Sequence, residues 1–226
     1  NAGIDLVYCP ENIRLGQAID LFLHPDLLVI GSNSERARRK AEEFYEWVGS
    51  EKLCVSFKTA EMSKHALNAF FATSISFANE IGTLCDAIGA DGIKIAEILK
   101  KDSRIGKKAQ VRPGLGFAGA TLARDLRSLQ DLGKKLCVST QLINDVLEIN
   151  QKQLDHIVEV LEHCFKGGLK QKIVTIFGLT YKPGTSTLRR SAALQVIRIL
   201  QSKGALISAH DPKADLRECS KPITFK

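Results

Sequence analysis

The segment between Thr59 and Gly89 constrains the fold of this 226-residue chain more than any other part of the sequence. Its apolar residues recur at steps of three and four, the spacing of one face of an α-helix: Met62, Ala66, Ala69, Phe70, Thr73, Phe77, Ile81, Leu84 and Ile88. At a rise of roughly 1.5 Å per residue, this helix is on the order of 45 Å long. The stripe is either core within the chain or the interface of a homodimer built on the helix, and both interpretations stay open.

The rest of the middle of the chain also has helical patterns. Residues 91–101 predict a short helix, and another is expected from about Ala123, after a glycine-rich loop. Residues 138–165 repeat apolar side chains at helical spacing. Residues 59–166 are therefore predicted to form an all-helical domain, which the long helix makes the candidate dimerisation domain.

Short apolar runs before the long helix predict the end of an α/β domain at residues 1–58. A helix is expected at 34–49, where Ser34 is the N-cap and Gly49 the stop. Three runs rich in apolar and β-branched residues have the composition of buried strands: 5–11, 27–32 and 52–57. The order of these elements is that of an α/β domain.

The segment from 167 to 226 begins with two glycines that form a candidate hinge. A strand at 172–179, a loop at 180–187, a helix at 188–204 and a strand at 205–212 make one β-α-β unit of a nucleotide-binding type. The expected fold class is therefore α/β with a central all-helical dimerisation domain and partial Rossmann-like segments at both ends.

Composition argues against several classes of protein. The hydrophobic fraction of 44% can form a buried core. Neither an apolar run of about 18 residues nor a leader pattern is found, so we expect a cytoplasmic protein with no membrane partner. The 6 cysteines are scattered without C-x-x-C spacing, which predicts reduced thiols and no metal site. The net charge of +7 comes with only 6% aromatic residues and no basic tract, which argues against a nucleic-acid partner.

The stretch RPGLGFAGATLARD, residues 112–125, contains Gly114, Gly116 and Gly119 in the spacing G-x-G-x-x-G. A dinucleotide-binding loop with this spacing needs a strand that leads into its first glycine. Here the preceding residues are charged, and Pro113 stands directly before Gly114. The three glycines are therefore not expected to hold a cofactor pyrophosphate.

Four stretches resemble motifs of the UDP-glucose/GDP-mannose dehydrogenase family, in the family's order. YCPENIRLGQAIDLFLHPDLLVIGS is similar to its Y-S-P-E-R-L-x-x-G segment, and AEMSKHALNAFFATSISFANEIGTLCDAIGAD to its A-E-x-x-K-x-x-x-N-A-F-x-A helix, which the D-x-R-I-G turn follows as DSRIG. GLGFAGATLARD resembles the G-[FY]-G-G-S-C-F-P-K-D active-site segment. FGLTYKPGTSTLRRSAA is similar to its G-x-x-F-K-x-x-T-D-D-x-R-x-S loop.

The resemblance implies an NAD-dependent oxidoreductase that acts on a nucleotide sugar. On this reading residues 1–58 are the end of the NAD-binding domain, 59–166 the central helical domain and 167–226 the start of a UDP-binding Rossmann-like domain. NAD is the implied cofactor, although the strand-led glycine loop that holds it in the family is not in this sequence. The implied partners are a nucleotide-sugar substrate and a second copy of the chain.

Site residues follow from the same resemblance. Glu11 orients water or substrate, Lys64 and Asn68 hold a developing oxyanion, and Thr121 and Asp125 complete the catalytic set. Without the resemblance, Lys64 and Asn68 could also be a solvated lysine and a surface asparagine. An ammonium group beside an amide donor is nevertheless a pair that can stabilise an alkoxide oxygen. Arg124 and Arg189 are the implied cofactor ligands. The implied substrate ligands are Ile13, Arg14, Leu15, Gly16, Arg104, Arg112, Phe117, Ala118, Tyr181 and Lys182.

The sequence departs from the family pattern at the reacting end of the substrate. Thr121 stands where the family has its catalytic cysteine, and Arg124 replaces a lysine. The T-D-D triplet becomes Thr185, Ser186 and Thr187, and an arginine, Arg190, replaces an acidic residue. A threonine hydroxyl needs a strong base before it can act as a nucleophile, so covalent capture of an aldehyde should be lost. Cys9 is a stray candidate nucleophile or simply a strand residue.

Two functions remain open on these grounds. The favoured one is an enzyme that oxidises a sugar hydroxyl with NAD but lacks the cysteine-dependent second oxidation; the chain by itself is expected to be inactive. The alternative is a non-catalytic module of the same fold that binds nucleotide sugars or oligomerises.

Overall fold

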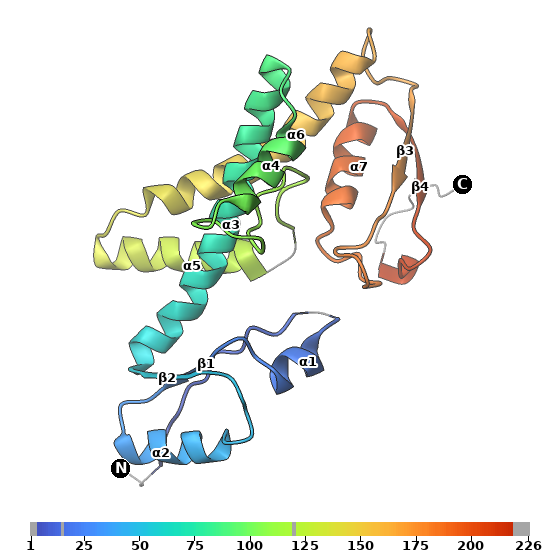
Figure 1. Cartoon of the computed structure of the whole chain (residues 1–226). Coiled ribbons are helices and arrows are strands. Elements are labelled where there is room, and N and C mark those ends of the chain that lie inside the picture. The colour runs from blue at the N-terminus through green and yellow to red at the C-terminus, as the bar shows by residue number, and fades with distance from the viewer. Residues whose placement is uncertain (1–3, 15, 119–120, 219–226) are drawn as a thin grey trace. The chain divides into compact units, whose positions relative to one another are not determined.

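The computed structural model describes residues 4–14, 16–118 and 121–218, and the chain divides into two compact units (Figure 1). Unit 1 is Asn1–Leu67 and unit 2 is Asn68–Lys226, so the boundary falls inside helix α3, Phe57–Ile88. The three domains expected from the sequence stay a prediction. Gly119 and Leu15 lie outside the described residues, as does Cys219.

Unit 1 is built on two parallel strands. Strand β1, Leu28–Gly31, pairs with β2, Lys52–Val55, and helix α2, Glu35–Phe44, connects them. A short helix α1, Ala18–Leu23, precedes β1. The core of the unit lies where α2 covers the sheet and consists of Leu28, Ile30, Ala41 and Val48.

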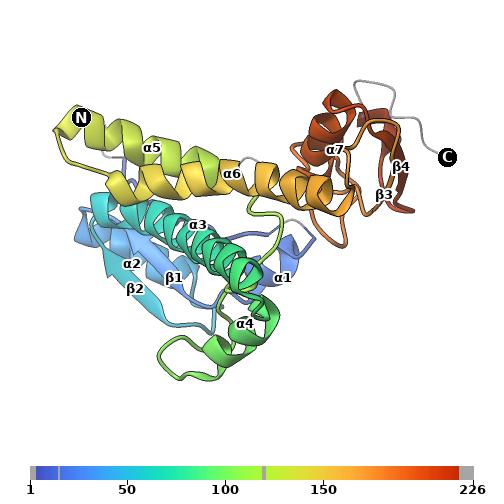
Figure 2. The same ribbon diagram turned by 90° about the horizontal axis from the view of Figure 1, so that it is seen from above.

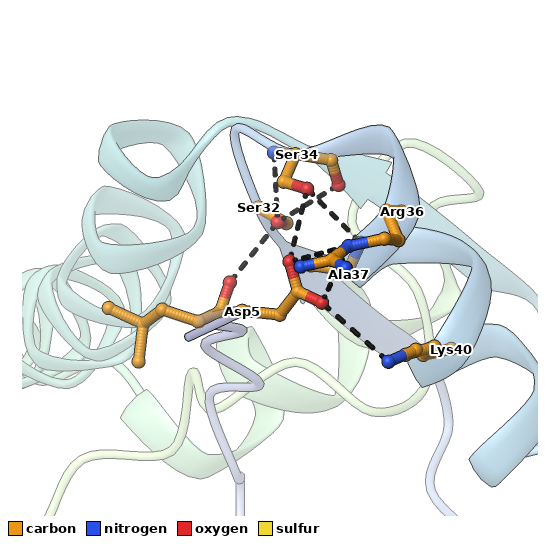
Figure 3. Close-up of polar contacts among 7 residues, drawn as sticks. Asp5, Ser32, Ser34, Arg36, Ala37 and Lys40 are labelled. Carbon is orange, nitrogen blue, oxygen red and sulfur yellow. Dashed lines mark hydrogen bonds and ion pairs between the residues drawn. The ribbon is translucent and has the colours of Figure 1, made fainter. Parts of the chain in front are cut away.

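The predicted cap of α2 is confirmed. The Ser34 side chain accepts a hydrogen bond from the backbone N–H of Ala37 at 3.2 Å. Figure 3 shows that the Asp5 carboxylate reaches the same turn, where it pairs with Arg36 at 3.0 Å and Lys40 at 3.8 Å. These contacts tie the start of the chain to the first turns of α2.

Two expectations for unit 1 were wrong. Residues 5–11 form no strand: a single bridge pairs Tyr8 with Gly31, and Pro10, which has no N–H to donate, follows shortly after. Helix α2 ends at Phe44 rather than at Gly49, because Tyr45 leaves the helical conformation at φ −97° and ψ 20°.

Helix α3 confirms the predicted long helix but corrects which face is buried. In unit 2 its buried residues are mostly small, and they include Ala69, Ala72 and Ser76. They pack against α5, Thr121–Leu136, and α6, Gln141–Cys164, which run side by side in Figure 2. Small side chains allow the helices to approach closely, and the Ser76 hydroxyl donates to the Val146 carbonyl at 3.1 Å.

The large members of the predicted stripe face outward. We call Phe70, Phe77, Leu84 and Ile88 the outer stripe; these residues are 69%, 46%, 57% and 78% exposed. The interpretation of the whole stripe as core within the chain was therefore wrong for these positions. Periodicity could not distinguish the two faces, because alanines and serines form the buried one.

The remaining helices of the central region also confirm the prediction. Helix α4, Gly92–Lys101, begins after Asp91, whose carboxylate accepts from two backbone N–H groups of the first turn. Helices α5 and α6 follow, and the described residues between 57 and 164 contain no strand. The fold is mixed α/β with a helical centre, as expected.

The end of unit 2 is the expected β-α-β segment. Strand β3, Ile173–Phe177, pairs in parallel with β4, Leu206–His210. Helix α7, Ala192–Ser202, connects the two strands. A 3-10 turn, η1, follows at Leu216–Glu218. Helix α7 starts later than the predicted residue 188, because Arg190 adopts a left-handed φ of 55° and Ser191 is the N-cap. Helices α6 and α7 share one core, which includes Leu154, Val158, Val196 and Leu200.

Candidate active site

The glycine loop before α5 is held by amide side chains from two helices. Asn79 of α3, which is only 1% exposed, accepts from the Gly114 N–H at 2.8 Å. Asn150 of α6 accepts from the Phe117 N–H at 2.7 Å and donates to the Phe117 carbonyl at 3.1 Å. Gln153 donates to the Gly114 carbonyl at 2.8 Å. Side chains therefore replace the hydrogen bonds that regular structure would give this loop.

Gly116 is the described glycine of this loop whose conformation and surroundings require a glycine. Its φ is +81°, and a Cβ at this position would lie 2.5 Å from Asn150 Oδ1. The described residues 107–118 form no strand, so nothing leads into Gly114 as a dinucleotide fingerprint requires. Close approach to a neighbouring helix explains Gly116 without a cofactor.

A buried carboxylate stands at the start of α5. Asp125 is 2% exposed and accepts a hydrogen bond from the Asn68 side-chain amide. Arg124 Nε lies 3.4 Å from its other oxygen. A buried charge needs such partners, and this one fixes the orientation of the Asn68 amide. Thr121, the exposed first residue of α5, is one turn before Asp125 on the same face of the helix.

Two other predicted catalytic residues, Lys64 and Glu11, contact each other in unit 1. Lys64 Nζ lies 2.8 Å from Glu11 Oε2, and the lysine side chain is 21% exposed. Lys64 is four residues before Asn68 on continuous helix α3, which is one helical turn. Burial raises the pKa of the Cys9 thiol, which favours the interpretation of Cys9 as a structural residue over that of a nucleophile.

The predicted substrate ligands are spread over several loops. Ile13, Arg14 and Gly16 lie before α1, with Gly16 at φ 85°, whereas Leu15 lies outside the described residues. Arg112 is exposed. Arg104 pairs with Asp102 at 2.7 Å, and this arginine holds the pKa of the Asp102 carboxyl below its usual range.

Two of the predicted ligands belong to the glycine loop. Phe117 is 9% exposed and packs in the core with Leu126 and Val146, so it mainly stabilises the loop. Phe117 and Ala118 also line a cavity together with Arg124.

Tyr181 and Lys182 lie in the loop between β3 and α7. The Tyr181 N–H donates to the Thr187 carbonyl at 2.9 Å, and the Lys182 carbonyl accepts from the Thr185 hydroxyl at 2.7 Å. Arg189, a predicted cofactor ligand, is 84% exposed and lies 3.8 Å from Glu218. Arg124 and Arg190 line the cavity, and Arg189 is not among its lining residues.

Sequence reasoning missed two carboxylates that hold this loop. Glu218 accepts from the Thr187 hydroxyl and from the Leu188 N–H, both at 2.8 Å, and the Thr187 bond is the main cause of the lowered pKa of Glu218. Asp211 accepts from the N–H groups of Leu179 at 2.7 Å and Thr180 at 3.0 Å. An aspartate directly after a strand was the available signal for Asp211; nothing in the sequence pointed to Glu218.

Asp211 predicts a pH dependence of stability. The hydrogen bond from the Leu179 N–H is the main cause of the lowered pKa of the Asp211 carboxyl in the folded chain. The ionised carboxylate therefore stabilises the fold at pH values above the pKa of the unfolded chain, and this stabilisation is lost as the pH falls through the pKa of the folded chain. Acidification from about pH 5 to about pH 3 should therefore lower the melting temperature of the wild type more than that of Asp211→Asn. Thermal melts over that range measure this; equal slopes for the two proteins would contradict it.

Some classes of site find no support in the part of the chain that the structure describes. No cluster of three histidine, cysteine or acidic side chains there could hold a metal ion. Among the same residues, no helix combines the length and apolar character needed to cross a bilayer.

Family models match two parts of the chain. The model described as the UDP-glucose/GDP-mannose dehydrogenase family, central domain, matches residues 58–152, and the UDP binding domain of that family matches residues 175–223. The chain belongs to this dehydrogenase family. The glycine loop, Asn68, Asp125 and α5 all lie within the match to the central domain.

Relatives agree with the family assignment. UDP-glucose 6-dehydrogenase TuaD of Bacillus subtilis is 38% identical over 93% of this chain and 45% of its own length. AglM of Haloferax volcanii, also a UDP-glucose 6-dehydrogenase, is 33% identical over 99% of this chain and 53% of its own. A UDP-glucose dehydrogenase structure from Pyrobaculum islandicum superposes with a TM-score of 0.92 at 33% identity, covering 98% of this chain and 52% of that one. The chain thus spans about half the length of the relatives it matches.

Proposed function

We propose that this dehydrogenase-family chain contributes to oxidation of a hydroxyl group on a UDP sugar, with NAD as hydride acceptor. The observation that carries the proposal is the Asn68–Asp125 pair beside the glycine loop. Because Asp125 is buried and charged, it holds the Asn68 amide in one orientation, and preorganised donors are what stabilise a developing oxyanion. Lys64, one turn earlier on α3, supplies a cation for the same task.

The reaction is balanced as a two-electron oxidation. With NAD bound, the alcohol would lose a hydride to the cofactor and a proton to a base, which would yield a carbonyl compound, NADH and a proton. We assign Glu11 to orienting the substrate or accepting that proton, and its carboxylate pairs with Lys64 at 2.8 Å within unit 1. NAD supplies only the hydride acceptor; Arg124 beside the cavity is the residue that fits its negative charge.

Thr121 limits the reaction to this first step. Its hydroxyl ionises far less readily than a thiol, which has a pKa of about 8.5, so it does not add to an aldehyde as a cysteine does. The expected product is a carbonyl compound formed with one NADH per sugar. A uronate would need a second NAD and a covalent intermediate.

The test compares the chain with Thr121→Cys, each joined to the dinucleotide-binding domain of a relative. The chain should form about one NADH per UDP sugar, whereas the cysteine variant should form about two and release a uronate. NADH absorbance and mass spectrometry of the sugar measure both. Thr121→Ala, which should keep the single oxidation, is the matched control.

The alternative function is a non-catalytic module that binds nucleotide sugars or oligomerises. The outer stripe favours oligomerisation, because four large apolar side chains on one helix face are exposed in a single copy. No NADH with any of a panel of UDP sugars, alongside intact binding of those sugars by calorimetry, would favour this alternative over the enzyme.

A further inference from the structure

Four aromatic side chains form a continuous cluster in unit 1, which we call the aromatic patch. They are Phe22 of α1 and, at or just after the end of α2, Phe44, Tyr45 and Trp47. The ring centroids of Phe22 and Trp47 lie 5.8 Å apart, and those of Phe44 and Tyr45 lie 4.9 Å apart. These are the separations of packed rings. The patch thus joins two segments that are distant in the sequence.

The backbone that carries the patch is fixed by contacts within unit 1. Tyr45 packs against the core of the unit. The Ser50 hydroxyl donates to the Pro25 carbonyl, and the Leu28 N–H donates to the Glu51 carbonyl at 3.0 Å. Both hydrogen bonds join the segment after α1 to the segment after α2. The rings of the patch are therefore held in place before any partner binds, which lowers the entropy lost on binding.

The outer rings of the patch are not covered by the rest of unit 1. Phe22 and Trp47 each keep about half of their surface exposed, and Phe44 keeps 68%. A cluster of exposed aromatic side chains is typical of an interaction surface, because their burial is favourable. Tryptophan is among the residue types most enriched at the centres of protein interfaces. The chain has 1 tryptophan, and it lies in this patch.

The segments around the patch are acidic, although the net charge of the chain is +7. Residues 17–27 and 41–51 contain aspartates and glutamates but no lysine or arginine. Glu43 and Glu46, which are exposed and lie within the second segment, form no ion pair with any residue that the structure describes. The rim of the patch therefore complements a positively charged partner.

The two lysines that border the second segment are already engaged. Lys40 pairs with Asp5 at 3.8 Å, and the Lys52 ammonium donates to the Val48 carbonyl at 2.8 Å. Neither contact involves Glu43 or Glu46, so the negative charge of the rim is left for another molecule.

We propose that the aromatic patch binds a basic, amphipathic protein segment. The apolar side chains of that segment pack on the exposed rings, and its arginine or lysine side chains lie against the rings and beside Glu43 and Glu46. Cations are attracted to the faces of aromatic rings, most strongly to tryptophan, and arginine also stacks on them. The charge of the rim selects this class of partner over acidic segments. The inference does not depend on the proposed function.

Tryptophan fluorescence tests this surface directly, because Trp47 is the only tryptophan of the sequence. The whole chain is titrated with a synthetic amphipathic peptide of leucine and arginine, and separately with a peptide in which glutamate replaces every arginine. The arginine peptide should shift the Trp47 emission to shorter wavelengths as the ring leaves water, and its affinity should fall as salt is added. The glutamate peptide should cause no shift.

Variants that keep Trp47 separate the contributions of the rings and of the rim. Phe22→Ala should weaken binding of the arginine peptide about tenfold, because it removes one packed ring. Glu43→Gln together with Glu46→Gln should weaken it about threefold at low salt. Phe177→Ala in β3 and Glu159→Gln in α6 are the matched controls, since both residues are exposed in unit 2, and they should leave binding unchanged. Circular dichroism confirms that each variant is folded.

Several results would overturn the proposal. One is no shift with the arginine peptide, or equal shifts with both peptides; another is equal weakening by Phe22→Ala and Phe177→Ala. An emission shift that depends on chain concentration alone, and that Phe22→Ala abolishes, would assign the patch to a second copy of the chain instead. A peptide response that is lost when the chain is joined to the dinucleotide-binding domain of a relative would assign the patch to contacts within the longer protein.

Discussion

Gly116→Ala is expected to destabilise unit 2 by about 2–3 kcal/mol. An alanine at φ +81° adopts a left-handed conformation that costs roughly 1–2 kcal/mol. Its Cβ would also lie 2.5 Å from Asn150 Oδ1, which accepts the Phe117 N–H, so that hydrogen bond must lengthen or break. A lost bond at a part-buried site costs about 1 kcal/mol more.

Urea denaturation followed by circular dichroism measures this change. Gly114→Ala is the matched control in the same loop, because a Cβ at Gly114 would have no atom within 4 Å of it and the φ there is not left-handed. The control should lose less than about 1 kcal/mol. If the two substitutions destabilised the chain equally, the close contact with Asn150 would not be what requires a glycine.

Substitutions in the outer stripe are expected to change the oligomeric state of the chain. We expect the chain to form a homodimer through this face of α3, because its four apolar side chains are spaced seven, seven and four residues apart, as in a coiled-coil seam. Replacing Phe77 and Leu84 together with aspartate should raise the dimer dissociation constant at least about a thousandfold. Each change removes a buried apolar side chain and places a charge in the interface.

Light scattering and sedimentation over a range of concentrations measure the dissociation constant. Asp86→Asn is the control, because Asp86 is an exposed polar residue of α3 on the side of the helix opposite the outer stripe. A wild type that stays monomeric at the highest concentration, or a double variant that still dimerises, would contradict this interface. Retained helicity of the double variant would separate loss of the dimer from loss of the fold.

The sequence predicted the elements better than it predicted their contacts. Helix α3, the Ser34 cap and the β3-α7-β4 order follow from periodicity and capping chemistry, which are local properties. The sequence left open whether the stripe of α3 is core within the chain or a dimer interface, because periodicity marks a face of a helix and not what covers it. Only packing shows that alanines such as Ala72 form the contact.

The candidate site shows the same division. The resemblance singled out Asn68 and Asp125, and the structure joins them by a hydrogen bond. It did not single out Asn79 or Asn150. These side chains bind the glycine loop, from which they are 33 or more residues away in the sequence, so only the folded structure shows their role. Arg124 and Arg189 were both predicted as cofactor ligands from the resemblance; Arg124 lines the cavity, whereas Arg189 lies beside Glu218, and their roles stay a prediction.

The alanine and serine side of α3 has a consequence for how such chains can diverge. Because these small residues set the spacing to α5 and α6, even one added methyl group there would disturb the helical centre. The opposite side bears no such restriction within one copy. Assembly partners can therefore change over evolution while the scaffold around Asn68 and Asp125 is preserved.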